Sequence, residues 1–184
     1  MKFNPERDQR RSIRLKGYDY REAEDYFVTI CARNRECLFG EITEGELRLN
    51  DRGKIVRKEW VRTAVLRPYV ELDSFIVMPN HIHGIICILE GGRGTARRAP
   101  TSGRFGHPIP CSLPTIIGAF KSACTRRINE MEKTTGVLWQ RNYYKHIIRN
   151  ESELNRVREY IADNPVRWGE DIYNPDYGDK KCPR

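Results

Sequence analysis

The spacing between hydrophobic residues changes several times along the chain, and these changes predict where its strands and helices lie. Alternating apolar residues between turn residues indicate strands, whereas apolar residues three or four apart indicate helices. In chain order the pattern predicts a strand within residues 26–34, a helix within 51–68, strands within 70–79 and 81–90, a helix within 112–132, a strand within 137–149 and a helix within 150–165. A short hairpin or irregular excursion is expected within residues 37–50, turned at Glu44-Gly45.

The first six elements follow the order of the split βαβ, or ferredoxin-like, fold. We therefore predict an α+β protein with one antiparallel sheet and two helices on one face. Asp51 is expected to cap the first of these helices, and Pro68 lies beyond its end. The apolar stripe of this helix comprises Ile55, Val56, Trp60 and Val61. The buried side of the second helix comprises Ile116, Ile117, Phe120, Cys124 and Ile128.

The last predicted helix carries a separate apolar stripe that is expected to pack on the sheet. Its members are Leu154, Val157 and Ile161, which recur at helical spacing. Asn150 and Glu153 form a capping-box-like pair at the start of this helix.

The length of 184 residues suits one compact domain, which we place at residues 1–170. Residues 1–21 form a basic N-terminal arm, with seven Lys or Arg against three Asp or Glu. Residues 91–110 are rich in Gly, Pro, Ser and Thr, hold four Arg and no acid, and are predicted to form a flexible basic loop. Residues 171–184 are expected to form a polar tail.

The charge balance favours a polyanionic partner, above all nucleic acid. The formal net charge is +8 and the isoelectric point is about 9.3. No apolar run is long enough to cross a membrane, and the N-terminus lacks the apolar core of a signal peptide. The six cysteines form no CxxC pair, so reduced thiols in a cytoplasmic protein are expected.

The candidate chemistry starts from His81 and His83, one residue apart in a predicted strand. Because side chains alternate across a strand, both histidines point to one face and Ile82 points to the other. The pair is either two polar residues on a half-solvated sheet face or the start of a metal site. A histidine-triad hydrolase would place a third histidine where Ile85 stands. A cupin site would place a carboxylate nearer than Glu90.

A third metal ligand has candidates on the last predicted helix. Tyr160 and Asn164 lie one turn apart on a single helix face. Taken alone, Tyr160 also fits the rim of the core, and Asn164 also fits a helix end before Pro165.

Several blocks together resemble the HUH endonuclease superfamily and, within it, the single-tyrosine transposases of the insertion-sequence type. The resemblance is strongest to the REP-associated tyrosine transposases and runs from about residue 10 to residue 168. The blocks are "YFVTICARN", "ELDSFIVMPNHIHGIICIL", "IIGAFKSACTRRIN" and "LWQRNYYKHIIRNESELNRVREYIADNPVRW".

The resemblance implies a role for each matching residue. His81 and His83 would be the metal-binding histidines, Tyr160 the nucleophile, and Asn164 the polar metal ligand one turn later. Several relatives have Gln at that last position, and Asp163 is the alternative ligand here. The implied activity is cleavage and joining of single-stranded hairpin DNA, with Mg²⁺ or Mn²⁺ as cofactor and a 5′-phosphotyrosine intermediate. The implied assembly is a monomer or a homodimer.

DNA contacts are expected from basic residues outside the core. These would mostly meet phosphates and would supply affinity more than sequence choice. The candidates are Arg10, Arg11, Arg14, Lys16, Arg97, Arg98 and Arg156.

Three alternatives stay open at this point. The chain could be a basic ferredoxin-like module that binds structured nucleic acid without cutting it. It could also be a replication initiator or relaxase with the same tyrosine chemistry. If Tyr160 were inert, Tyr144 would be the next candidate nucleophile, while His146 in "YYKHIIR" is expected to be structural.

Overall fold

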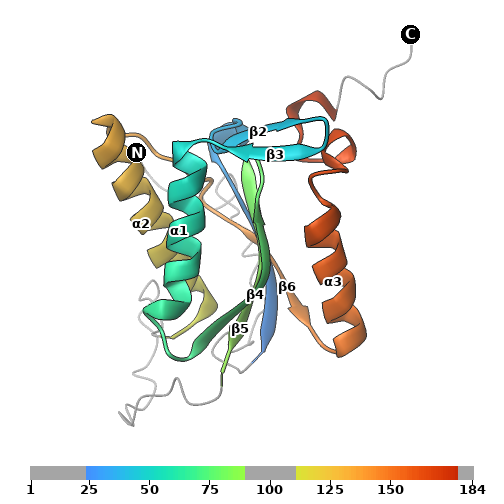
Figure 1. Ribbon diagram of the computed structural model, residues 1–184. Helices are drawn as coiled ribbons and strands as arrows, with labels where there is room; N and C mark the ends of the chain where they lie inside the picture. The colour runs from blue at the N-terminus through green and yellow to red at the C-terminus, as the bar shows by residue number, and fades with distance from the viewer. Residues whose placement is uncertain (1–23, 90–110, 178–184) are drawn as a thin grey trace, which may run out of the picture.

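The computed structural model describes residues 24–89 and 111–177, and it confirms a mixed α+β fold with an antiparallel sheet (Figure 1). The strands are β1 (Asp25–Cys31), β2 (Gly40–Thr43), β3 (Glu46–Leu49), β4 (Val70–Val77), β5 (His81–Ile88) and β6 (Tyr144–Ile148). The α-helices are α1 (Asp51–Val65), α2 (Leu113–Glu132) and α3 (Glu151–Asp163). Short 3₁₀ turns lie at Arg33–Arg35, Trp168–Glu170 and Pro175–Tyr177.

The main sheet has the strand order β4-β5-β1-β6, and every neighbouring pair is antiparallel. Strand β5 therefore lies between β1 and β4, the strands of the main sheet that come before and after α1 in the chain. Because β5 is hydrogen-bonded on both sides, it is a central strand of the sheet. The predicted hairpin is confirmed as β2 and β3, and its turn residues Glu44 and Gly45 both have positive φ.

The helices cover opposite faces of the sheet. In Figure 1, α1 and α2 lie on one face and α3 lies on the other. Alternation along β1 and β5 divides their side chains between two cores. The larger core joins Tyr26, Val28, Ile30, Ile82, Ile86 and Ile88 to the buried sides of α1 and α2. The smaller core, under α3, joins Phe27, Ile85, Ile148, Leu154 and Ile161, with Val157 packed against it.

The predicted buried side of α2 is confirmed, whereas two details of α1 are wrong. Asn50, not Asp51, caps the helix: its side chain accepts a hydrogen bond from Gly53 N at 3.0 Å. Asp51 is the first helical residue and pairs with Lys54. Val61 is exposed because it lies off the face that Val56 and Trp60 bury, so it does not belong to the stripe.

Gly84 on β5 allows the sheet and α1 to approach each other closely. A Cβ atom added at Gly84 would lie 2.4 Å from Cζ2 of the buried Trp60. Glycine at this position therefore leaves room for the Trp60 ring on the face of β5 opposite the two histidines.

Two further findings concern the predicted basic segments and membrane-spanning helices. The predicted basic arm and basic loop, with Arg10, Arg11, Arg14, Lys16, Arg97 and Arg98, lie outside the described residues. No helix within the described ranges is both long enough and apolar enough to span a membrane.

Candidate metal and tyrosine site

Strand alternation places His81 and His83 on the α3 face of the sheet, as predicted, while Ile82 enters the larger core. Both histidines are buried, with 0% and 1% of their surfaces exposed, so the open, half-solvated face considered from the sequence does not exist. The C-terminal segment after α3 covers His81: the ring centroids of Tyr173 and His81 lie 4.7 Å apart.

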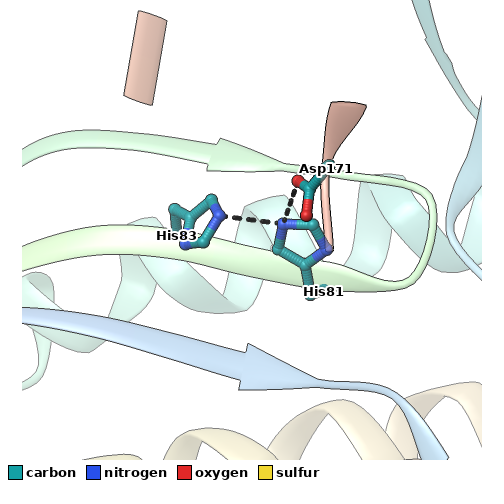
Figure 2. A group of neighbouring side chains, drawn as sticks. All are labelled: His81, His83 and Asp171. Carbon is teal, nitrogen blue, oxygen red and sulfur yellow. Dashed lines mark hydrogen bonds and ion pairs between the residues drawn. The ribbon is translucent and has the colours of Figure 1, made fainter. Parts of the chain in front are cut away.

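The two imidazole rings point their Nε2 atoms at each other, 2.9 Å apart (Figure 2). Their Nδ1 atoms face away, toward Asn80 Oδ1 at 2.8 Å from His81 and toward Thr29 Oγ1 at 2.9 Å from His83. Burial lowers the pKa of both rings, that of His83 to about 3, and the nearby His83 and Arg35 lower the pKa of His81 further. Both rings are therefore neutral at pH 7, the form that binds metals.

Asp171 completes a cluster that the sequence did not predict. Its Oδ2 lies 3.7 Å from His81 Nε2, and the side chain is only 4% exposed (Figure 2). Oδ1 accepts a hydrogen bond from Tyr173 N at 2.7 Å, whereas Oδ2 accepts none within the described part of the chain. Burial raises the pKa of this carboxyl group. His81, His83 and Asp171 offer ligand atoms that all lie within 4.8 Å of one another.

Asp171 belongs to the segment predicted to be a polar tail, because an isolated acid in an irregular segment carries no periodic signal. The predicted boundary at residue 170 therefore divides the site. The segment is held by specific contacts instead: Asn174 Nδ2 donates to Trp168 O at 2.8 Å, and Arg35 Nη1 donates to Ile172 O at 3.1 Å.

Asn164 lies at the end of α3 with 4% of its surface exposed. Its hydrogen bond to Tyr160 lowers the pKa of the tyrosine, and its buried Oδ1 has no partner among residues 24–89 and 111–177. Asp163, the alternative ligand, is instead exposed and pairs with Arg167 at 3.5 Å. It points away because it lies on the solvent side of α3, so Asp163 is not part of the site.

Tyr160 reaches the histidine pair from α3. Its hydroxyl oxygen lies 3.3 Å from His83 Nε2, and its ring packs edge-on against Phe27 with centroids 5.9 Å apart. Burial raises the pKa of Tyr160 and Asp171 raises it further, so the phenol keeps its proton at neutral pH. The residue is still 45% exposed, which leaves the phenol open to a substrate.

Local contacts explain how α3 holds Tyr160 in place. Asn150 caps the helix by accepting a hydrogen bond from Glu153 N at 2.9 Å, as predicted. The Glu153 carboxylate reaches one residue further back than in a capping box, to Arg149 N. The predicted stripe of Leu154, Val157 and Ile161 packs on the sheet. The pattern thus predicted which face of α3 is buried.

The remaining predicted residues lie around the site. Arg156 is exposed on α3, one turn before Tyr160. Tyr144 shares the α3 face through its register opposite Thr29, is 54% exposed, and packs edge-on against Phe27. His146 Nε2 lies within hydrogen-bond distance of Glu153 Oε1, at 2.7 Å, in keeping with a structural role.

The donor set fits a divalent cation. Two neutral imidazoles, the Asp171 carboxylate, whose Oδ2 has no hydrogen-bond partner in the described ranges, and the buried Asn164 amide oxygen are all groups that ligate metals. A tyrosine hydroxyl beside such a group can act as a nucleophile on a phosphate ester.

Proteins similar to this chain are known from bacteria. No family model matches the chain. A 40% identical protein of Haemophilus influenzae, described only as uncharacterized, aligns over 178 residues, 92% of this chain and 96% of the relative. A REP-associated tyrosine transposase of Escherichia coli is 24% identical over 145 residues, 78% of this chain and 67% of the relative.

The fold is also known from a solved structure. The REP-associated tyrosine transposase bound to a REP hairpin superposes with a TM-score of 0.59 and 21% identity, covering 85% of this chain and 75% of that chain. The named relatives and the solved structure of the same fold are REP-associated tyrosine transposases, so the chain is similar to this family over most of its length.

Proposed function

We propose that this protein cleaves and rejoins single-stranded DNA at hairpins, with Tyr160 as the nucleophile. One observation carries the proposal: the Tyr160 hydroxyl lies 3.3 Å from His83 Nε2, at the edge of the His81, His83 and Asp171 cluster. Hairpin DNA as the substrate is supported by the related transposase whose structure contains a REP hairpin. The strand order β4-β5-β1-β6 supports a ferredoxin-like fold for the catalytic domain.

His81, His83 and Asp171 would hold the divalent metal, Mg²⁺ or Mn²⁺, with Asn164 Oδ1 as a further oxygen ligand. Asp171 thus takes the place that the sequence gave to Asp163. When bound, the metal polarises the scissile phosphate and stabilises the negative charge that develops on its oxygens. Because the Tyr160 hydroxyl lies 3.3 Å from His83 Nε2, a phosphate that reaches Tyr160 would lie beside the residues that would hold the metal.

The covalent step follows from the position of Tyr160. Its phenolic oxygen forms a bond to phosphorus and gives up its proton, while the bond from phosphorus to the 3′ oxygen breaks. The departing 3′ oxygen takes a proton and becomes a free 3′ hydroxyl, and the 5′ phosphate stays on Tyr160. Because the phosphotyrosine is itself a phosphodiester, a 3′ hydroxyl can reverse the reaction and join the strands without ATP.

Binding of the DNA would draw on charge outside the reaction centre. Arg156 lies exposed one turn from Tyr160 and is placed to meet the scissile strand. The basic residues of the arm and loop, Arg10, Arg11, Arg14, Lys16, Arg97 and Arg98, would add phosphate contacts. Tyr160 and the ligand residues come from one chain, so a monomer would suffice for one cut and a homodimer for paired cuts. We place this activity in the bacterial cytoplasm, at the nucleoid, where the chromosomal DNA lies.

A covalent-adduct assay tests the proposal. The full chain is mixed with 3′-labelled single-stranded hairpin DNA from the palindromes that flank its gene, with Mn²⁺ or Mg²⁺, and run on a denaturing gel. We expect a protein–DNA band that disappears with EDTA and with Tyr160→Phe. Tyr144→Phe is the matched control and should keep the band. A band that survives Tyr160→Phe would place the nucleophile elsewhere, and hairpin binding without any band would indicate a non-catalytic module.

A further inference from the structure

Asn80 is a completely buried asparagine immediately before β5, and it connects three segments of the chain. Its Nδ2 donates hydrogen bonds to Arg35 O at 2.9 Å and to Tyr173 O at 2.7 Å. Its Oδ1 lies 2.8 Å from His81 Nδ1. Every polar atom of this side chain is therefore used, although none of them reaches the metal-binding atoms.

These contacts fix the orientation of the amide. If the amide were reversed, its oxygen would face two carbonyl oxygens at 2.7 and 2.9 Å with no hydrogen between them. Oδ1 must therefore be the atom that faces His81. Since an amide oxygen can only accept, His81 Nδ1 must carry the ring proton. Nε2 of His81 then presents a lone pair toward His83 and Asp171.

We infer that Asn80 is a positioning residue of the metal site, an inference that rests on the proposed function. It fixes His81 in the tautomer that exposes Nε2, a role that hydrogen-bonded partners of ligating histidines commonly have. It also holds Tyr173 O, two residues after Asp171, whose own Oδ1 accepts from Tyr173 N. One buried amide thus aligns His81 with the segment that carries Asp171.

His83 has a different kind of partner. The Thr29 hydroxyl, 2.9 Å from His83 Nδ1, can either donate or accept a hydrogen bond. In the metal-free protein, His81 Nε2 is an acceptor 2.9 Å from His83 Nε2, so His83 must donate from Nε2. Thr29 then donates to His83 Nδ1. Loading the site requires the His83 proton on Nδ1 instead, and the Thr29 hydroxyl can rotate to accept it. The metal-free protein is therefore asymmetric: one histidine is fixed and the other can change its tautomer.

Long-range ¹H–¹⁵N NMR of the wild-type chain tests this directly, because ring nitrogen shifts report the tautomer. We expect the proton on Nδ1 of His81 with and without Mg²⁺. For His83 we expect the proton on Nε2 without Mg²⁺ and on Nδ1 with it. A metal-free His81 that carries its proton on Nε2 would overturn the inference, and this measurement needs neither a variant nor DNA.

Variants separate positioning from a general structural role. Asn80→Ala should weaken Mn²⁺ binding about 10- to 100-fold, measured by titration of the DNA-free protein. Asn129→Ala is the matched control: the Asn129 side chain also makes two hydrogen bonds, to Gly136 O and Thr134 Oγ1, but it lies on α2, across the sheet from the site. Its Mn²⁺ affinity should stay within about twofold of wild type. Equal affinities for the two variants would contradict a positioning role.

Asn80→Asp provides a second check if the alanine variant does not fold. The carboxylate keeps an acceptor for His81 Nδ1 but loses both donors, so the His81 tautomer should persist while stability falls. A mixed His81 tautomer in this variant would overturn the inference. A wild-type chain that binds no Mn²⁺ would instead contradict the proposed function, and the two failures are therefore distinguishable.

Discussion

Arg158 on α3 and Asp73 on β4 form a forked ion pair across 85 residues of sequence, with Nη2 and Oδ2 2.6 Å apart and Nε and Oδ1 3.0 Å apart. Asp73 lies where the register between β4 and β5 shifts. The Arg158 guanidinium holds the pKa of Asp73 below its usual value. This pair ties the helix that carries Tyr160 to the edge of the sheet that carries the histidines.

We expect Asp73→Asn to slow formation of the covalent adduct, because α3 would lose its charged link to β4 and Tyr160 would be held less firmly. Glu151→Gln is the control, since Glu151 also contacts Arg158 but from α3 itself, at 3.4 Å. The rate of adduct formation at saturating DNA measures the effect. Equal rates for the two variants would show that the smaller core alone positions α3.

Asp171 and Asp163 offer a matched pair of acids for metal binding. Asp171→Asn should weaken Mn²⁺ binding at least about tenfold, because it removes a charged ligand beside His81. Asp163→Asn should bind Mn²⁺ like wild type, because Asp163 is exposed and pairs with Arg167. Titration calorimetry of the DNA-free protein would measure both. If only the Asp163 variant lost Mn²⁺ affinity, Asp163, the alternative named from the sequence, would be the ligand instead of Asp171.

The metal-free protein should lose stability as the pH falls below about 6.5. Burial lowers the pKa of His83 from 6.5 to about 3, so in this range the unfolded chain binds a proton that the folded chain does not. The stabilising contribution is complete above pH 6.5 and declines as the pH falls toward 3. His83 alone should cost about 2 kcal/mol of unfolding free energy between pH 7 and pH 5. Urea unfolding in EDTA measures it, and a His83→Gln variant with an equally steep pH dependence would exclude His83 as the cause.

Two glycines should respond in opposite directions to alanine. Gly84→Ala should destabilise the fold by about 1–3 kcal/mol, because the new Cβ would press on buried Trp60. Gly118→Ala should stabilise it by about 0.5–1 kcal/mol, because Gly118 lies within α2 with nothing within 4 Å of an added Cβ. Chemical denaturation compares them. Wild-type stability of Gly84→Ala would mean that Trp60 can move aside.

The sequence predicted the parts of the site that obey a local period. Strand alternation correctly paired His81 with His83, and helical spacing put Tyr160 and Asn164 on one side of α3. It could not predict Asp171, whose position depends on an irregular segment folding back over β5. It also misplaced the cap of α1, because Asn50 and Asp51 are adjacent residues with similar capping ability and only backbone geometry distinguishes them.

The central place of β5 in the sheet implies that the two histidines and Tyr160 lie on elements with different free energies of local unfolding. Backbone amides of β5 are bonded to β1 and β4 on both sides, and such strands exchange their hydrogens with solvent through global unfolding. Helix α3 rests on the smaller core and on the Asp73–Arg158 pair, so its amides should exchange through smaller openings. As denaturant is added, the protein should therefore release its tyrosine from the site before it releases its two histidines.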